Sequence, residues 1–169
     1  RGKSGIAVFR VSGKHSHKII KSMSSKKKFN INTPTLNNIL DSGGLVDQTL
    51  TTYFKSPKSY TGEDMVEISC HGSLSVINKI TELLLKKNTR LAEPGEFTKR
   101  ALMNDKLTVV EAETIGDLIN SETENQRKIA IGNLSGKLDK FVEGVSKKLK
   151  KLLADVEAII DFADEDLPK

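Results

Sequence analysis

The sequence predicts an α/β (α+β) fold in which an N-terminal domain with a mixed sheet precedes long helices. Apolar, β-prone runs separated by turn residues occur at 5–11, 45–54 and 65–70. A helical-period stripe lies between residues 73 and 87, and a heptad repeat begins near residue 138. We therefore expect an N-terminal domain over 1–105, and over 106–169 the first part of an incomplete helical bundle.

The composition indicates a globular protein without an obvious polyanion-binding face. The 169 residues are 37% hydrophobic and 29% charged, which is enough apolar sequence for a core. The net charge of +5 is modest and dispersed, and tryptophan is absent, which disfavours a base-stacking platform. No apolar run is long enough to cross a bilayer, and a single cysteine fits a reducing cytoplasm. We expect a cytoplasmic protein that does not enter membranes.

The elements of the first half follow from local patterns. Gly5–Val11 is a nearly continuous apolar strand, and a short helix is expected over 14–23. Residues 30–44 are rich in Asn, Thr, Ser, Pro and Gly and are expected to be mostly loop. Further strands are predicted over 45–54, 65–70 and 89–92, and helices over 73–87 and 94–103.

Two charged residues interrupt these strands. Val66, Ile68 and Cys70 share one face of their strand, which leaves Glu67 on the other, and Arg10 lies in the middle of the first strand. A carboxylate in mid-strand is costly to bury unless a cation or donor faces it. The two residues either form a structural ion pair or line a pocket for a polar ligand. The pattern alone favours the ion pair.

The second half reads as helix almost throughout. Thr108 and Glu111 fit a capping box, and from about residue 122 to 162 the pattern is helical. Gly132 and Gly136 either weaken this helix locally or permit a close crossing. Apolar residues spaced alternately by four and three form a heptad seam, which needs a partner helix. Its members are Leu138, Val142, Val145, Leu149, Leu152, Val156 and Ile159.

Four other patterns suggest a catalytic, metal-binding or phosphate-binding site, but their residue spacing or surroundings do not support one. Cys70 shares a face with Val66 and Ile68, so it reads as a buried structural cysteine rather than a nucleophile. The histidines lack zinc-ligand spacing, and the acidic stretch 161–166 lacks calcium-loop spacing, so no metal site is expected and 161–166 reads as a helix end passing into a linker. Gly2-Lys3-Ser4 lacks the upstream glycine and strand of a P-loop.

The segment 94–106 is more unusual. It gathers ionisable residues around Phe97 and Leu102 and then turns at Asn104-Asp105. The segment is either an amphipathic helix with a polar cap, or a turn that positions Lys106 over the same pocket as Arg10 and Glu67.

These stretches together resemble the tRNA uridine-modification GTPases of the MnmE (TrmE) family. The resemblance covers essentially the whole chain and does not depend on one short motif. The matching residues are Ile6–Gly13, Ser59–Glu67 with His71-Gly72, Pro94–Ala101 with Asn104–Leu107, Glu111–Glu113 with Asp117–Ile119, and Asp161-Phe162 with Glu165-Asp166.

The resemblance implies a fold and a function. The N-terminal domain is expected to resemble the tetrahydrofolate-binding module of aminomethyltransferases, to dimerise, and to bind 5-formyl-tetrahydrofolate or methylene-tetrahydrofolate. Folate-contacting positions of the family match Arg10, Glu67 and Lys106, which reverses the preference for a purely structural ion pair. The full protein is expected to work with a flavin-dependent partner, MnmG (GidA), and to modify carbon 5 of the wobble uridine of certain tRNAs.

This sequence also departs from the family pattern. The family's first strand, its G domain with GTP, Mg²⁺ and K⁺, and its C-terminal cysteine motif have no counterpart here, so this chain is expected to lack GTPase activity and to hold no catalytic residue. We expect the exposed seam to pair with another copy or to swap. The alternatives are a dimerisation scaffold with a vestigial folate site and a stand-alone one-carbon transferase. The transferase alternative is weakened because no candidate acid, base or nucleophile remains.

Overall fold

A computed structural model describes residues 3–161 of the chain. Their contacts divide the chain into two compact units, residues 1–107 and residues 108–169, and each unit is described by itself. None of the described helices is both long and apolar enough to span a membrane.

The first unit is built on a four-stranded sheet in the order β1-β4-β3-β2. The strands are β1 (Ser4–Ser12), β2 (Thr35–Asp41), β3 (Gly44–Phe54) and β4 (Met65–Gly72), and each neighbouring pair is antiparallel. The prediction of a mixed sheet is therefore wrong. A parallel pairing required a strand at 89–92 after the helical crossover, and that segment forms no strand.

Strand β2 was missed because it lies in the polar stretch that predicted a loop. Asn37 is buried in its centre, where its side-chain nitrogen donates to Ser24 Oγ over 2.8 Å. Ile39, two residues further on, is fully buried. Tertiary burial and hydrogen bonding thus override the low β-propensity of asparagine.

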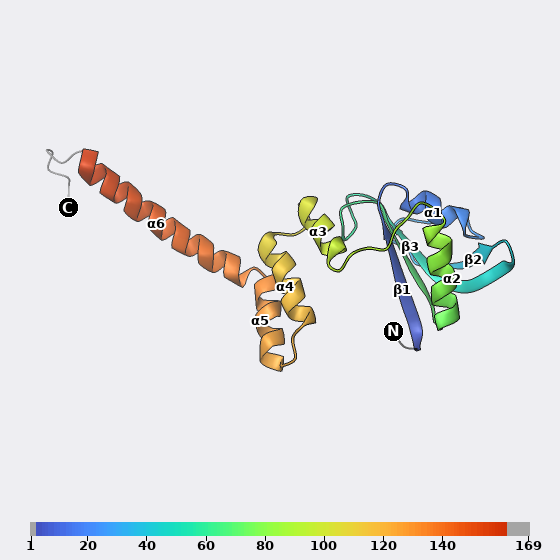
Figure 1. Cartoon of the computed structure of the whole chain (residues 1–169). Coiled ribbons are helices and arrows are strands. Elements are labelled where there is room, and N and C mark those ends of the chain that lie inside the picture. Colours follow the sequence, from blue (N-terminus) through green and yellow to red (C-terminus); the bar gives the residue numbers. More distant parts are fainter. Residues whose placement is uncertain (1–2, 162–169) are drawn as a thin grey trace. The chain divides into compact units, whose positions relative to one another are not determined.

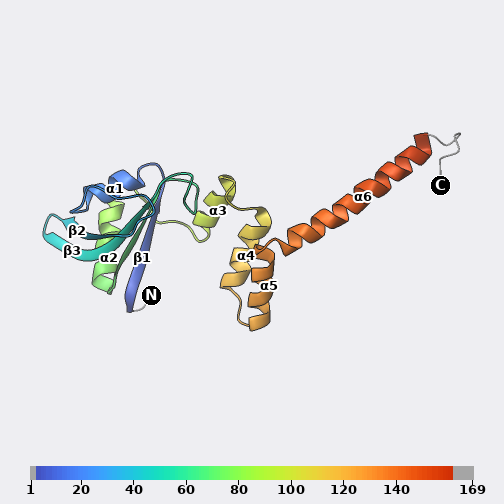
Figure 2. The same ribbon diagram turned by 180° about the vertical axis from the view of Figure 1, so that it is seen from behind.

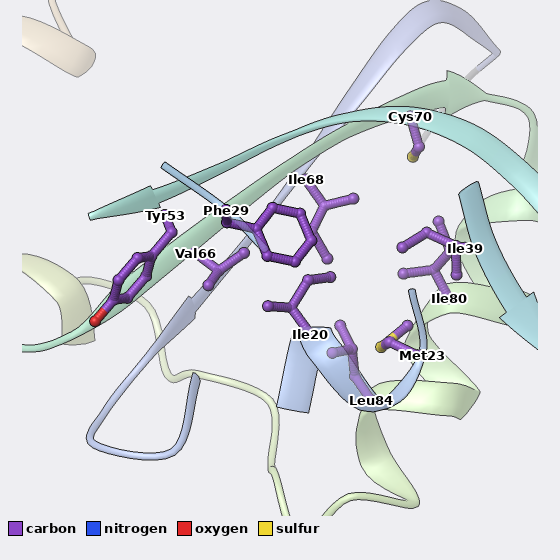
Figure 3. Close-up of a cluster of buried hydrophobic side chains, with 10 residues drawn as sticks. All are labelled: Ile20, Met23, Phe29, Ile39, Tyr53, Val66, Ile68, Cys70, Ile80 and Leu84. Atoms are coloured by element: carbon purple, nitrogen blue, oxygen red, sulfur yellow. The ribbon is translucent and has the colours of Figure 1, made fainter. Parts of the chain in front are cut away.

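The core lies on one face of this sheet, under helices α1 (Ser16–Ser22) and α2 (Leu74–Leu85) (Figures 1 and 2). Val66, Ile68 and Cys70 of β4 are buried on this face, as the alternation predicts. Figure 3 shows side chains from both helices meeting those of the sheet. The cluster comprises Ile20, Met23, Phe29, Ile39, Tyr53, Val66, Ile68, Cys70, Ile80 and Leu84.

The opposite face of the sheet, which we call the outer face, carries exposed side chains. One row of paired residues crosses all four strands, with the central Ser69 flanked by apolar neighbours. The row consists of Val8, Ser69, Leu50 and Leu36, and its three apolar members are each about half exposed. A neighbouring row contains Arg10 opposite Glu67.

Helix α3 (Glu96–Met103) begins two residues later than the sequence predicts. Gly95 precedes it with a φ of 75°, a left-handed conformation that glycine adopts readily. At its C-terminus, Asp105 adopts a φ of 53°, the amide of Asp105 donates to Leu102 O and the amide of Lys106 donates to Ala101 O. This pair of bonds is a Schellman motif, and it confirms the predicted turn at Asn104-Asp105.

The second unit contains α4 (Val109–Ile119), α5 (Glu124–Leu134) and α6 (Lys137–Asp161). The capping box predicted at Thr108 is confirmed, and a second one starts α5 at Thr123. Gly136, with a φ of 77°, separates α5 from α6, so it breaks the helix rather than weakening it. Every residue of the predicted heptad seam is exposed on α6, as expected. Most of the acidic stretch 161–166 lies outside the described residues.

Candidate cofactor-binding site

Arg10 and Glu67 face each other on the outer face of the sheet. They are direct partners in the antiparallel β1–β4 register, and Arg10 Nε donates to Glu67 Oε1 over 2.6 Å. The ion pair favoured by the pattern alone is therefore present. The arginine side chain is 50% exposed and the glutamate side chain 27%, so this pair contributes only about 0–1 kcal/mol to stability.

The ion pair leaves recognition groups available to a ligand. Within residues 3–161, neither Glu67 Oε2 nor the terminal guanidinium nitrogens of Arg10 make a hydrogen bond. Each carboxylate oxygen accepts up to two hydrogen bonds, so Glu67 can still accept a pair of donors from a ligand. The two roles considered from the sequence are thus compatible.

The turn 59–64, which precedes β4, borders this pair. The guanidinium carbon of Arg10 lies 5.8 Å from the centroid of the Tyr60 ring, within the range of a cation–π interaction. The Tyr60 hydroxyl and Thr98 Oγ1 of α3 are 2.9 Å apart, which joins the turn to that helix. The aromatic ring therefore stands beside Arg10 in a fixed position.

A partly buried hydrogen-bond network fixes the turn itself. Thr61 is fully buried, and its hydroxyl lies 2.6 Å from Ser12 Oγ at the end of β1. Ser12 Oγ also lies 2.8 Å from Glu63 Oε2, to which it donates. The side-chain nitrogen of Asn104 donates to Thr61 O over 2.7 Å. Strand β1, the turn and the end of α3 are therefore joined at one place.

Ion pairs extend this network along α3. Arg100 bridges two carboxylates, with its Nη1 3.0 Å from Glu63 Oε2 and its Nη2 2.8 Å from Glu96 Oε1. Arg90 also donates to both oxygens of Glu96. Hydrogen bonds from Arg90, from the backbone of Glu93 and from Arg100 hold the pKa of Glu96 far below its usual range. The network orients α3 against the turn.

Lys106 reaches the same turn from the end of α3. Lys106 closes the Schellman motif, and the hydrogen bond from its backbone amide to Ala101 O fixes its backbone position. Its side chain packs on Gly62, where a Cβ atom would lie 3.1 Å from Lys106 Cγ. The structure thus brings Arg10 and Glu67 into contact and places Lys106 against the adjoining turn. Within residues 3–161, Lys106 makes no hydrogen bond or ion pair with the other two.

A cavity of about 410 Å³ lies beside this site on the core side, between β1, α1, α2 and the segment 88–92. Arg10 contributes to its lining, whereas Glu67 and Lys106 do not. We therefore place the candidate site on the outer face and not in this cavity.

Sequence reasoning missed one further polar pair. Asp47 of β3 is buried, and it accepts hydrogen bonds from the backbone amide of His71 over 2.9 Å and from its ring Nδ1 over 2.7 Å. A carboxylate inside a predicted strand was the available signal, as it was for Glu67. Cys70, the residue before His71, is a buried cysteine as predicted, and burial raises the pKa of its thiol.

The site offers one carboxylate with accepting capacity, a guanidinium, an ammonium group and an aromatic ring. Such a set is chemically complementary to a flat heterocycle that carries hydrogen-bond donors on one edge and anionic or carbonyl oxygen elsewhere. It contains no activated nucleophile within residues 3–161. The groups present are those that bind a polar ligand through hydrogen bonds and charge.

Comparisons with known proteins agree on a family for both units. Residues 1–106 match the family described as "GTP-binding protein TrmE N-terminus", and residues 109–169 match the family described as "MnmE helical domain". Together the two matches cover nearly the whole chain.

Curated relatives carry the name "tRNA modification GTPase MnmE". The relative from Pelagibacter ubique is 47% identical over 172 residues, which cover 99% of this chain and 39% of the relative. The relative from Clostridioides difficile is 41% identical, covering 98% of this chain and 38% of the relative. The relative from Thermotoga maritima is 42% identical, covering 97% and 37%. The chain thus spans less than two fifths of the length of these relatives.

Proposed function

The chain belongs to the MnmE (TrmE) family of tRNA modification GTPases, and we propose that its first unit binds a one-carbon folate for that modification. The observation that carries the proposal is the Arg10–Glu67 pair on an open sheet face, with Lys106 packed against the adjoining turn at the end of α3. The resemblance in sequence selects these same three residues.

The chemistry of a pterin fits this set of groups. Its pyrimidine edge presents adjacent N–H donors, which a carboxylate accepts in bidentate fashion. Glu67 supplies the acceptor, and the hydrogen bond from Arg10 orients that carboxylate. The remaining cations, the guanidinium fork of Arg10 and the ammonium of Lys106, face carbonyl or formyl oxygens. We propose 5-formyl-tetrahydrofolate as the ligand and methylene-tetrahydrofolate as a further form, bound by a module like that of the aminomethyltransferases.

The remainder of the proposed function concerns the whole protein. A GTPase domain using GTP, Mg²⁺ and K⁺, the flavin-dependent partner MnmG (GidA) and tRNA would act together in the cytoplasm to modify carbon 5 of the wobble uridine. The chain described here contributes cofactor binding and assembly, and we propose that it is inactive by itself.

We propose that two copies associate through α6. Its heptad seam is a self-complementary pattern, and all seven of its residues are exposed in the single chain. Pairing two such helices buries both stripes. This exposed seam also favours the second candidate function, an assembly scaffold whose folate site is vestigial.

Calorimetric titration of the chain with 5-formyl-tetrahydrofolate tests the proposal and separates the two candidates. We expect saturable binding by the wild type, and its loss in Arg10→Ala and in Glu67→Ala. Because the ion pair contributes little to stability, both variants should keep the wild-type unfolding transition. Exposed Lys58→Ala, in the loop before the turn, is the control and should bind normally. A folded wild type that binds no folate would leave only the scaffold.

A further inference from the structure

Positive charge is concentrated at the start of the chain. The first 40 residues hold nine lysines and arginines and no aspartate or glutamate, whereas the remaining 129 hold 18 lysines and arginines and 22 acidic residues. The modest net charge of +5 is therefore the sum of +9 in the first segment and −4 in the remainder. Such an asymmetry indicates a surface for an anionic partner when the cations lie together in the fold.

Five lysines of this segment lie on α1 or next to it. Lys18 and Lys21 are three residues apart on α1, so they share one side of the helix. Ile20 points the other way and is fully buried in the core. The remaining three lysines are exposed in the turn before α1 and in the segment after it. The five residues, which we call the basic surface, are Lys14, Lys18, Lys21, Lys26 and Lys28.

The segment 23–29, which follows α1, is held beside β2 (Figures 1 and 2). Two backbone hydrogen bonds of 2.8 and 2.9 Å join it to that strand. Met23 and Phe29 are buried at its two ends, and three consecutive lysines between them are exposed. The middle one, Lys27, donates from its Nζ to Lys21 O over 2.8 Å, which ties the segment to the end of α1. The lysines of the helix and of the segment therefore belong to one surface with a fixed backbone.

The charges of the basic surface have no counter-charge in the described chain. Within residues 3–161, none of its five ammonium groups makes an ion pair or a hydrogen bond. The neighbouring helix α2 differs, because its Lys79 lies 2.8 Å from Asp41 and its Lys86 pairs with Glu82. Like charges gathered without compensation repel one another, so binding an anionic partner relieves this repulsion.

The composition of the surface favours the phosphate backbone of an RNA over a membrane. Lysine presents a compact, hydrated charge that contacts phosphate oxygens without reading sequence. Among residues 13–29, no large apolar side chain is exposed, so the surface lacks the apolar residues with which an interfacial helix enters a bilayer. The proposed function supplies an RNA, because it has the whole protein act on tRNA.

We infer that the basic surface binds the phosphate backbone of the tRNA on which the whole protein acts. The inference rests on the part of the proposed function that concerns tRNA, and it does not depend on the folate site. Each ammonium group contacts phosphate as a point charge, so this surface holds the RNA in place without selecting its sequence.

The test is a fluorescence-anisotropy titration of a labelled RNA hairpin with the chain, repeated between about 50 and 200 mM KCl. The main variant combines Lys18→Gln and Lys26→Gln, which removes one charge from α1 and one from the segment after it. A second variant, with Lys18→Arg and Lys26→Arg, keeps both charges. The matched control combines Lys128→Gln and Lys147→Gln, which removes two exposed charges that already belong to ion pairs.

We expect the wild type to bind the hairpin with an affinity that falls steeply with salt. Five phosphate contacts give a slope of about −3.5 to −4.5 in a plot of log K against log[KCl]. The glutamine double variant should bind about tenfold or more weakly at 50 mM KCl, and its slope should be shallower by about 1.4–1.8. The arginine double variant and the matched control should both bind as the wild type does.

Three results would overturn the inference. The first is an unchanged affinity and slope in the glutamine double variant. The second is an equal loss in the matched control, which would show that only net charge matters. The third is a wild type that binds vesicles of phosphatidylcholine and phosphatidylserine but no RNA, which would assign the surface to a membrane.

These outcomes are distinct from a failure of the folate site. Calorimetric titration with 5-formyl-tetrahydrofolate should give the same affinity for the glutamine double variant and the wild type, because neither lysine belongs to that site. RNA binding as expected without folate binding would leave the inference standing and remove the folate proposal, and the converse result would do the reverse. Since both lysines are exposed and make no side-chain contact listed above, the variant should keep the wild-type thermal unfolding transition.

Discussion

Gly62 is the position at which the candidate site depends most directly on backbone geometry. Its φ is 76°, and an added Cβ atom would lie 3.0 Å from Asn104 Cβ and 3.1 Å from Lys106 Cγ. In Gly62→Ala, the left-handed conformation costs about 1–2 kcal/mol. Overpacking against the end of α3 adds about 1–3 kcal/mol. We therefore expect a loss of roughly 2–5 kcal/mol in the free energy of unfolding of the first unit.

Gly95→Ala is the control that isolates the part of this loss caused by the left-handed conformation. Gly95 has nearly the same φ, 75°, but an added Cβ atom would meet nothing within 4 Å. It should show the conformational cost alone, about 1–2 kcal/mol. The difference between the two variants measures the close approach of the turn to Asn104 and Lys106. Chemical denaturation followed by circular dichroism gives both values.

The same pair of variants should differ in folate binding. Gly62→Ala displaces Lys106 and the turn, so we expect weaker binding of 5-formyl-tetrahydrofolate by the folded variant, whereas Gly95→Ala should bind as the wild type does. Equal stability and equal affinity of the two variants would refute the claim that Gly62 lets Lys106 reach the site.

Three further predictions concern the network, the core and the seam. Because its ion pairs lower the pKa of Glu96, this residue stabilises the fold above its unfolded pKa of about 4.3, and the contribution is lost as the pH falls below that value. The stability difference between wild type and Glu96→Gln should therefore shrink progressively as the pH is lowered from about 4 toward the depressed pKa of Glu96, and a constant difference in urea unfolding would contradict this. Ile68→Ala should cost about 2–5 kcal/mol in the same assay, because its side chain is fully buried, while exposed Val8→Ala should change stability by less than about 0.5 kcal/mol. Leu149→Glu should shift sedimentation at micromolar concentration toward monomer, whereas off-seam Lys150→Glu should not, and a monomeric wild type would remove the proposed pairing.

The sequence predicts elements well where side-chain period and burial agree. Strand β4 and its buried face follow from strict alternation, and α4 follows from its capping box. Strand β2 does not follow from its own sequence, because the hydrogen-bond partner of the buried Asn37 side chain lies in another part of the chain. The segment 89–92 has a strand-like composition, but composition does not say whether a neighbouring strand is available. The parallel part of the expected sheet depended on this segment.

The candidate site, too, could be predicted only in part from the sequence. Arg10 and Glu67 were recognisable as a pair because charges in mid-strand need partners, although their register became known only from the structure. The contribution of the turn 59–64, and of Arg100 as its link to α3, depends on contacts between residues about 40 positions apart. The role of Asp47 was hidden for a similar reason, since its partner His71 follows on the next strand.

The most direct test of the central claim is a crystal structure of the chain with 5-formyl-tetrahydrofolate bound. We expect the pyrimidine edge of the pterin within hydrogen-bonding distance of the Glu67 carboxylate on the outer face of the sheet, with Arg10 and Lys106 on the oxygens of the same ligand. A pterin ring bound remote from Glu67, for example in the cavity between β1 and α2, would contradict it.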